Sequence, residues 1–551
     1  AMLSQSGSMA GAVARHLQDS GFGCAYIVSV GNETVLSLLD LMAYMIEQDD
    51  VRVLLLFLEG LKDGDRLVAL ARRARAKGIV VVALKAGSST AGRAAVASHT
   101  GKLTTADAIY RDIFTQAGVL QVASLVELIE AAQVFTSAPL PRVDAGGVGV
   151  FSIPGGTRAL TADLCEARSV PLAQFSRDTI TALEAVLPSF GVATNPTDVT
   201  GQVLSQPELF ETALQIVARD PATTSLIVQL ANRGPSDALR YKASFAARAR
   251  DRAMPVVVSF LADAIAPRDV AAFARDGILC ARDPADAVRY VDWLYAVART
   301  AHRPAPRFTP PASRALGTLP TGWPGAMQLL AEAGIATPRW AIVPAGASPA
   351  AALDTLALPV AVKALPEQAE HKTEQRLLRL NLRTAEAVDD AVHALRATLG
   401  SSAPLLMQEM CAPGVECVLS AFRDRDFGVV VALGSGGVRV ELMRDIGYLN
   451  PPIMADDVER IVERLLLGRM LEGFRGAAAA DRPALVQSVL GLARAFAARS
   501  SELAEVEINP IIVLPRGQGV AAVDVLVKPA DPTNQNTAAI RGRNEEMQCN
   551  A

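Results

Sequence analysis

Two apolar segments separated by a polar helical segment most constrain what this 551-residue chain can fold into. Val51–Leu58 form the first apolar run, residues 65–77 form the polar segment, and Ile79–Leu84 form a second run that ends at Lys85. Such runs are typical of strands buried on both faces, and the helix between them predicts a βαβ unit with parallel strands. Because ligands of these sheets bind at the carboxyl ends of the strands, we expect Glu59 and Lys85 to lie at a binding edge.

The length and composition narrow the class of protein. A chain of 551 residues is too long for one hydrophobic core, so three or four domains are expected. No stretch approaches the roughly 20 apolar residues that a membrane span needs, and the six cysteines form no C-x-x-C pair. The net charge of −4 and the 5% aromatic content argue against a nucleic-acid partner. We therefore expect a cytoplasmic α/β protein with no membrane or nucleic-acid partner.

Further strand and helix patterns predict the domain organisation. A second α/β region follows the Pro/Gly-rich residues 139–147, with a strand at Val148–Ile153 and a helix at Thr157–Arg168. Its next strands are expected at Ser225–Leu230 and Pro255–Leu261. The predicted divisions are two α/β domains at 1–138 and 139–301, a Pro/Arg-rich linker at 302–315, a third domain at 316–530 and a disordered tail at 531–551.

His99 is the strongest single candidate for chemistry. It is one of five histidines and lies in a loop of small residues between a strand and a helix. Backbone N–H groups at such a position favour phosphate, so His99 is a candidate phosphoryl acceptor. The carboxylate of Glu59 could orient the imidazole and offset its developing positive charge. The alternative is an exposed strand-end acid and a histidine in an ordinary polar loop.

The third region carries residues suited to a nucleotide. Lys363 ends an apolar strand. The segment from Leu405 to Glu416 predicts a second strand, which carries Glu409, followed by a bend and a second acid, Glu416. A nucleotide site needs a lysine for phosphate charge and an acid for the ribose hydroxyls. Gly434–Gly437 predict a small-residue turn able to approach phosphates. Solvated strand-end charges and a plain loop are the alternatives.

The last predicted strand pair suggests a magnesium site. Glu507 and Asn509 share one face of an alternating segment, and Asp524 follows on the next strand. Asn and Asp supply the oxygen ligands that Mg²⁺ takes beside nucleotide phosphates. A solvated strand face is the alternative.

Together, these motifs resemble the acyl-CoA synthetases of the NDP-forming type, which are relatives of succinyl-CoA synthetase. The resemblance covers residues 1 to about 528, and its specificity comes from many short motifs in the same order. The matching motifs are Ser4–Gly7, Val30–Asn32, Leu58–Gly60, Lys85–Gly87, Ser98–Gly101, Asn195–Gly201, His371–Glu374, Gln408–Met410, Gly434–Gly437 and Glu507–Pro510. The resemblance implies an α/β fold with two flavodoxin-like (succinyl-CoA synthetase-like) parallel-sheet domains followed by an ATP-grasp domain.

The resemblance also implies a phosphate relay. The ATP-grasp domain binds ATP with Mg²⁺, and the γ-phosphate passes to His99, supported by Glu59. The phosphohistidine then phosphorylates a small carboxylic acid. The thiolate of coenzyme A, as co-substrate, attacks the acyl phosphate to give acyl-CoA, with ADP and phosphate as the other products. A homodimer is expected.

The motifs assign further residues by resemblance. His371 corresponds to a second histidine that ferries phosphate in some relatives. The expected nucleotide-binding residues are Lys363, Glu409, Met410, Glu416, Gly436 and Gly437. The expected acyl- and CoA-binding residues are Ser6, Gly7, Asn32 and Gly101, and the expected metal ligands are Asn509 and Asp524.

Two departures from the family pattern leave alternatives open. The loop after His371 continues as Gln375–Leu378, where the family usually has a Gly-Gly pair. The alternatives for this loop are that it moves differently or that it delivers no phosphate. No CoA-binding Rossmann domain precedes Ser4, and truncation of a longer polypeptide is the preferred explanation. The alternatives to a ligase are a relative that couples acid activation to a lyase step and a degenerate regulator that binds nucleotide or acyl-CoA.

Overall fold

The computed structural model describes residues 1–92, 106–144, 146–153, 155–204, 206–230, 241–261, 266–301, 303, 319–320, 322–365, 377–401, 403–436, 445–473 and 476–530. The chain divides into two compact units. Unit 1 comprises Ala1–Asp107 and Ala117–Ala305, and unit 2 comprises Ala108–Gln116 and Pro306–Ala551. Among the helices in these described ranges, none combines the length and apolar character required to cross a membrane.

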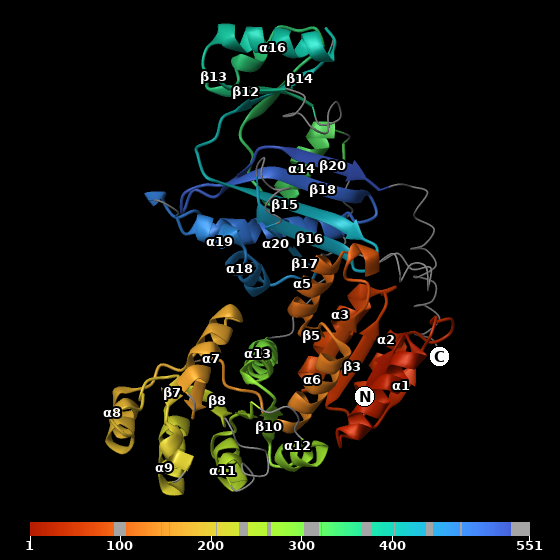
Figure 1. Ribbon diagram of the computed structural model, residues 1–551. Coiled ribbons are helices and arrows are strands. Elements are labelled where there is room, and N and C mark those ends of the chain that lie inside the picture. Colours follow the sequence, from red (N-terminus) through yellow and green to blue (C-terminus); the bar gives the residue numbers. More distant parts are fainter. Residues whose placement is uncertain are drawn as a thin grey trace. The chain divides into compact units, whose positions relative to one another are not determined.

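The first sheet of unit 1 has five parallel strands in the order β2-β1-β3-β4-β5, which is the flavodoxin-like order (Figure 1). All six residues of β3 are buried, which confirms the prediction from the first apolar run. The strands are β1 (Met2–Ser4), β2 (Ile27–Ser29), β3 (Val53–Leu58), β4 (Val80–Lys85) and β5 (Val119–Val122). The helices of this domain in unit 1 are α1 (Gly7–Asp19), α2 (Leu38–Met45), α3 (Gly64–Ala76) and α6 (Leu125–Ser137).

The second sheet of unit 1 is also parallel, with the order β10-β9-β8-β6-β7. The strands predicted near Val148, Ser225 and Pro255 are confirmed, with ends that differ by one or two residues. The strands are β6 (Gly147–Ser152), β7 (Thr197–Asp198), β8 (Thr223–Gln229), β9 (Val256–Ser259) and β10 (Ile278–Ala281). The helices are α7 (Gly155–Ala167), α8 (Arg177–Val186), the 3₁₀ helix η1 (Gly201–Leu204), α9 (Pro207–Arg219), α11 (Lys242–Arg252), α12 (Pro267–Ala274) and α13 (Pro284–Ala301).

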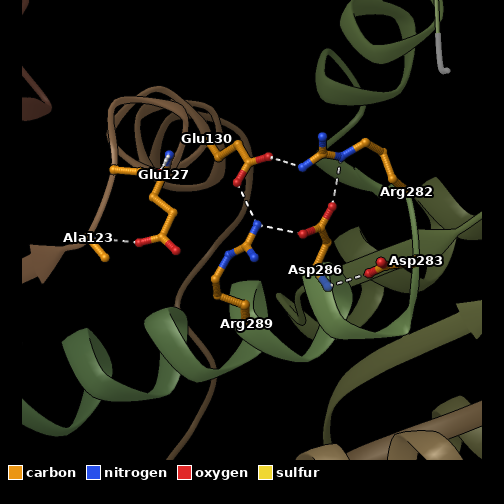
Figure 2. A network of polar contacts seen from close by, with 8 residues as sticks. Ala123, Glu127, Glu130, Arg282, Asp283, Asp286 and Arg289 are labelled. Carbon is orange, nitrogen blue, oxygen red and sulfur yellow. Dashed lines mark hydrogen bonds and ion pairs between the residues drawn. The ribbon is translucent and has the colours of Figure 1, made fainter. Parts of the chain in front are cut away.

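A network of ion pairs joins the two α/β domains of unit 1. Glu130 of α6 accepts from Arg282 at 2.9 Å and from Arg289 of α13 at 2.6 Å, and Asp286 accepts from both arginines at 2.8 and 2.6 Å (Figure 2). Apolar residues from both sheets and from α6 and α13 form one continuous core beside it. Burial raises the pKa of Glu130, and Asp286 raises it further, although Arg289 and Arg282 oppose the shift. The two domains therefore form one folded unit.

Unit 2 contains two sheets with antiparallel pairing. The smaller sheet has the order β11-β14-β12-β13, and α16 packs on it through a shared apolar core (Figure 1). The larger has the order β17-β16-β15-β18-β19, with β20 also paired to β18. The strands are β11 (Trp340–Val343), β12 (Val360–Ala364), β13 (Leu378–Leu382), β14 (Leu405–Glu409), β15 (Val415–Asp424), β16 (Gly428–Ser435), β17 (Ile446–Leu449), β18 (Leu503–Val513), β19 (Val520–Ala522) and β20 (Val525–Pro529). The helices are α5 (Asp107–Ala117), α14 (Gly322–Glu332), α15 (Ala350–Leu353), α16 (Ala385–Leu399), α18 (Ala455–Arg464), α19 (Leu466–Leu471) and α20 (Arg482–Ala498).

The predicted domain boundaries stay predictions. The division into two compact units differs from them at α5, because Ala108–Gln116 group with unit 2 although the chain on both sides belongs to unit 1. Apart from residue 303, the predicted linker at 302–315 lies outside the described residues, as does the predicted tail at 531–551.

Candidate active site

The first part of the site lies at the carboxyl edge of the first sheet. In the order β2-β1-β3-β4-β5, the chain runs outward in opposite directions from β1 and β3, so a crevice is expected where these strands end. Ser6 and Gly7 follow β1, Asn32 follows β2, and Glu59 follows β3. The fold brings these four predicted residues to one edge, as parallel strands require.

Gln5 holds the segment that carries Glu59. Its Oε1 accepts from the backbone N–H of Glu59 at 2.6 Å and of Gly60 at 3.1 Å, and its Nε2 donates to the carbonyl of Gly60 at 2.8 Å. Gln5 is 6% exposed, and its own backbone N–H donates to the carbonyl of Phe57 at 3.1 Å. One buried amide thus binds the Glu59–Gly60 segment through three hydrogen bonds, which restrict the direction in which the half-buried Glu59 leaves the strand.

Lys85 binds the same segment from the neighbouring strand. It is 6% exposed, and its Nζ donates to the carbonyl of Glu59 at 3.1 Å and of Ala86 at 2.5 Å. Buried ammonium groups need such acceptors, since burying an unpaired charge is costly. Lys85 therefore ties the ends of β3 and β4 together and places a positive charge beside the backbone of Glu59.

The N-terminus of α1 completes this edge. Ser6 is its N-cap residue but makes no side-chain cap bond; instead its N–H donates to Ser4 Oγ at 3.0 Å, and its Oγ lies 3.1 Å from Ser8 Oγ. A Cβ added at Gly7 would meet only Ser29 Oγ at 3.7 Å, which is ordinary contact. Packing therefore does not require glycine at this position, and close approach of a ligand is an alternative reason for it.

Four predicted residues lie outside the described part of the chain: His99, Gly101, His371 and Gly437. The chain connects His99 to two described elements. β4 ends at Lys85 before it, and α5 begins at Asp107 after it.

The nucleotide part of the site centres on Lys363, in unit 2. This residue of β12 is 3% exposed, and its Nζ donates to the carbonyl of Val523 at 2.7 Å and lies 3.7 Å from Asp524 Oδ1. The ammonium also lies 5.3 Å from the ring centroid of Trp323, within the range of a cation–π interaction. Lys363 therefore joins the smaller sheet to the larger one and holds a cation beside a carboxylate.

Asn509 and Asp524 lie next to each other. The backbone N–H of Asn509 donates to the carbonyl of Asp524 at 3.1 Å, and Asn509 Nδ2 donates to Glu507 Oε1 at 3.3 Å. The predicted pairing of the closing strands is confirmed, but Asp524 lies between β19 and β20 rather than within a strand. The carboxylate and amide oxygens of these residues are hard donors, so this group of residues fits Mg²⁺. In the described residues, no cluster of three or more His, Cys, Asp or Glu side chains suits a metal ion.

The other predicted nucleotide residues line the ends of β14 and β15. Glu409 Oε1 accepts from the N–H of Ala357 at 2.8 Å and lies 3.6 Å from Arg339, so its carboxylate already has partners in the fold. Met410 is 38% exposed, and Glu416 is exposed. Their nucleotide-binding roles stay predictions.

The expected turn at Gly434–Gly437 is corrected at its first two residues, Gly434 and Ser435. β16 continues through Ser435, because Gly434 pairs with Val418 on one side and Ile446 on the other. A Cβ on Gly436 would lie 2.5 Å from the backbone of Cys417, so close packing already requires a glycine there.

Lys85 was expected at the binding edge with Glu59, and its hydrogen bond to the Glu59 carbonyl agrees with that expectation. Two other residues at the site were not predicted: Gln5 and Trp323. Gln5 lies inside the Ser4–Gly7 motif, but the sequence did not show the pairing of β1 and β3 that brings its side chain to Glu59. Trp323 lies on α14, and no local pattern connects it with Lys363.

Comparison with known proteins agrees with this architecture. The chain matches a succinyl-CoA ligase like flavodoxin domain over residues 1–135, a ligase-CoA domain over 148–303 and an ATP-grasp domain over 322–528. It is 29% identical to a trans-feruloyl-CoA synthase from an unknown prokaryotic organism, over 95% of this chain and 75% of that protein. It is 27% identical to acetate–CoA ligase (ADP-forming) I of Archaeoglobus fulgidus, over 94% of this chain and 76% of that protein.

Among solved structures, the chain is similar to the dinucleotide-forming acetyl-coenzyme A synthetase 1 of Ca. Korarchaeum cryptofilum in complex with phosphate and ADP. The TM-score is 0.49 at 23% identity, and the match covers 54% of this chain and 64% of that one.

Two flavodoxin-like domains followed by an ATP-grasp domain define the class of acid–thiol ligases that use a nucleotide. Within that class, the chain belongs to the ADP-forming (NDP-forming) acyl-CoA synthetases, the relatives of succinyl-CoA synthetase. The predicted fold class and family are therefore confirmed.

Proposed function

We propose that this chain is an ADP-forming acyl-CoA ligase that converts a small carboxylic acid, ATP and coenzyme A into acyl-CoA, ADP and phosphate. One observation carries the proposal. The same chain holds a buried lysine beside Asp524 and Asn509 in an ATP-grasp domain and a tightly held Glu59 at the edge of a succinyl-CoA ligase-like domain.

The first step assigns His99 as the phosphoryl acceptor. A ring nitrogen of His99 attacks the γ-phosphorus of ATP, an N–P bond forms, and the bond to the ADP oxygen breaks. Lys363 stabilises the negative charge of the phosphates, with Asp524 and Asn509 as the ligands that would hold Mg²⁺. When bound, Mg²⁺ neutralises charge on the nucleotide phosphates.

Glu59 supports the phosphorylation of His99. The Glu59 carboxylate accepts a hydrogen bond from the other ring nitrogen of His99 and stabilises the positive charge that the imidazole gains on phosphorylation. Gln5 and Lys85 support this role, because they hold the Glu59 backbone on both sides.

The remaining steps transfer phosphate to the acid and the acyl group to sulfur. A carboxylate oxygen attacks phosphorus as the N–P bond breaks, which gives the acyl phosphate. The thiolate of coenzyme A then attacks the acyl carbon, and phosphate leaves. The open N-terminus of α1 at Ser6 and Gly7 offers backbone N–H groups to phosphate at this edge.

Labelling with γ-³²P ATP and Mg²⁺ tests the first step. The wild-type chain should form an acid-labile, base-stable phosphoprotein, and His99→Asn should remove the label. His393→Asn serves as the matched control, since His393 is an exposed histidine of α16 with Nδ1 2.9 Å from the Asp389 carbonyl. An unlabelled wild-type chain, or full labelling of His99→Asn, would contradict the proposal.

Acid-dependent release of ADP tests the overall reaction. The acids that the relatives' names indicate are acetate, 4-hydroxybutyrate and ferulate, so a panel of these with coenzyme A is the direct assay. The acyl-CoA product should appear in equal amount to ADP. Formation of any product with a broken carbon–carbon bond would favour a lyase instead. A homodimer remains the expected oligomeric state, and light scattering measures it.

A further inference from the structure

The helix α5 has an unusual place in the fold. The strand before it in the sequence is β4 and the strand after it is β5, and both belong to the first sheet of unit 1. Ala108–Gln116, however, pack as part of unit 2. In this helix only Arg111 and Thr115 are exposed, so α5 is enclosed on nearly all sides.

Asp112 makes the strongest polar contacts of α5. Its side chain is fully buried and accepts from both terminal nitrogens of Arg464, one of them at 2.8 Å, and from the backbone N–H of Tyr448 at 3.0 Å. A bidentate guanidinium–carboxylate pair fixes the relative orientation of the two groups as well as their distance. The hydrogen bonds that Arg464 donates to Asp112 raise the pKa of Arg464.

Two more polar contacts flank this pair. The side-chain amide of Gln116 donates to the Asn450 carbonyl at 2.9 Å and accepts from the Asn450 N–H at 2.9 Å. The amide thus pairs with the backbone of Asn450 in the same reciprocal way as the backbones of neighbouring strands pair. Tyr110 Oη donates to Asp426 at 2.7 Å in the turn between β15 and β16. Removing either partner of such buried bonds leaves an unsatisfied group.

An aromatic cluster supplies the apolar part of the contact. Tyr110, Phe114 and Phe427 meet edge to face, with ring centroids 4.8 to 6.5 Å apart. All three side chains are fully buried. α5 is therefore bound into unit 2 by three polar contacts, from Tyr110, Asp112 and Gln116, and by one aromatic cluster.

We propose that α5 anchors the His99 segment to the nucleotide-binding unit, and that Asp112 is a positioning residue for phosphoryl transfer between the nucleotide and His99. This inference rests on the proposed function. Asp107, the first residue of α5, follows His99 by only eight positions. Eight residues span at most about 29 Å when fully extended, so the chain between His99 and the start of α5 is a short tether.

Confinement of this kind acts through effective concentration. A tethered group meets its partner at a concentration set by the length of the tether, and loosening one end lowers it. The anchor therefore raises the rate at which His99 is phosphorylated without contacting ATP. It leaves the affinity of unit 2 for nucleotide unchanged.

Single-turnover phosphorylation by γ-labelled MgATP provides the test. Asp112→Asn should slow phosphohistidine formation about tenfold, as expected when a charged hydrogen-bond pair is lost. The dissociation constant for MgADP should stay within about twofold, because no nucleotide contact is removed. Glu332→Gln is the matched control, since Glu332 binds the buried Arg499 of unit 2 through two hydrogen bonds at 2.7 and 2.6 Å, and its hydrogen-bond partners Arg499 and Gln328 lie outside α5. Equal slowing in Glu332→Gln, or an unchanged rate in Asp112→Asn, would overturn the positioning role.

A second experiment tests the anchor independently of catalysis. A specific protease site is placed within residues 304–318 of the full chain, and the folded protein is cut there. The two fragments should coelute in size-exclusion chromatography, because α5 of the first fragment remains bound in unit 2. Tyr110→Ala combined with Phe114→Ala should let the cut fragments separate. Separation of the cut wild-type chain would overturn the anchor, whereas absence of phosphohistidine with coelution intact would reject only the proposed function.

Discussion

Two buried lysines, Lys85 in unit 1 and Lys363 in unit 2, use the same side chain in different ways. Lys85 donates to the backbone carbonyls of Glu59 and Ala86, so its charge helps to fix the path of the chain. Lys363 donates to one carbonyl but also lies beside Asp524 and a tryptophan ring. The comparison teaches that burial of a cation does not by itself indicate a ligand site. Lys363 is a candidate for the nucleotide site because Asp524 Oδ1 lies 3.7 Å from its ammonium group and belongs to a group of residues suited to a nucleotide and its metal.

The largest expected effect separates chemistry from binding. Glu59→Gln should lower the rate of ADP formation with acid and coenzyme A by about 10²- to 10³-fold, because a neutral amide stabilises the phosphorylated imidazole poorly. Nucleotide affinity should not change, because Glu59 lies in unit 1. Steady-state kinetics and MgADP titration measure the two quantities. A loss of nucleotide affinity in this variant would contradict the assignment of Glu59 to the chemical step and of nucleotide binding to unit 2.

Replacement of the two lysines sharpens the contrast. Lys363→Met should weaken MgADP binding by about 30- to 100-fold, because a charged contact to phosphate is removed. Lys85→Met should leave nucleotide binding unchanged and should lower the thermal stability of unit 1. Isothermal titration and thermal unfolding of both variants test this pair. Similar loss of MgADP affinity in both would mean that the two lysines do not differ as inferred.

Gln5 tests whether orientation of Glu59 depends on its neighbour. Gln5→Glu removes the donor to Gly60 and adds a negative charge, so activity should fall about tenfold. Gln5→Met removes all three hydrogen bonds to the Glu59–Gly60 segment without adding charge, so it should lower activity as well. Steady-state kinetics measures both variants. Wild-type activity in Gln5→Met would show that these hydrogen bonds do not orient Glu59.

The smallest effect concerns the junction of the two domains of unit 1. Because burial raises the pKa of Glu130, the folded state keeps a proton that the unfolded state loses above its ordinary value of 4.5. Unfolding free energy should therefore decrease as pH rises from that value through the raised pKa. Glu130→Gln should lack this component, and Glu127→Gln on the same helix should retain it. Urea titrations between pH 4 and pH 7 compare the slopes, and a wild-type slope in Glu130→Gln would refute the assignment.

Local patterns predicted much of the fold and several site residues. The apolar runs predicted at Val51–Leu58 and Ile79–Leu84 formed strands at Val53–Leu58 and Val80–Lys85, since burial on both faces leaves a continuous hydrophobic signature. Glu59 and Lys363 were identified because each ends or follows such a strand. The turn expected at Gly434–Gly437 was wrong for Gly434 and Ser435, which lie in β16, because glycines also allow close strand pairing and composition alone does not distinguish the two uses.

The sequence by itself determined the order of the three domains and the family, because short motifs in a fixed order can be read without knowledge of how the chain packs. Tertiary structure alone decided that Gln5 binds the Glu59 segment, that Lys363 reaches a carbonyl 160 positions away, and that α5 packs in the unit that does not contain its neighbours. The physical reason is that these contacts depend on strand pairing and packing between distant segments. The contribution of these contacts to the free energy of folding therefore leaves no pattern in any local stretch of the sequence.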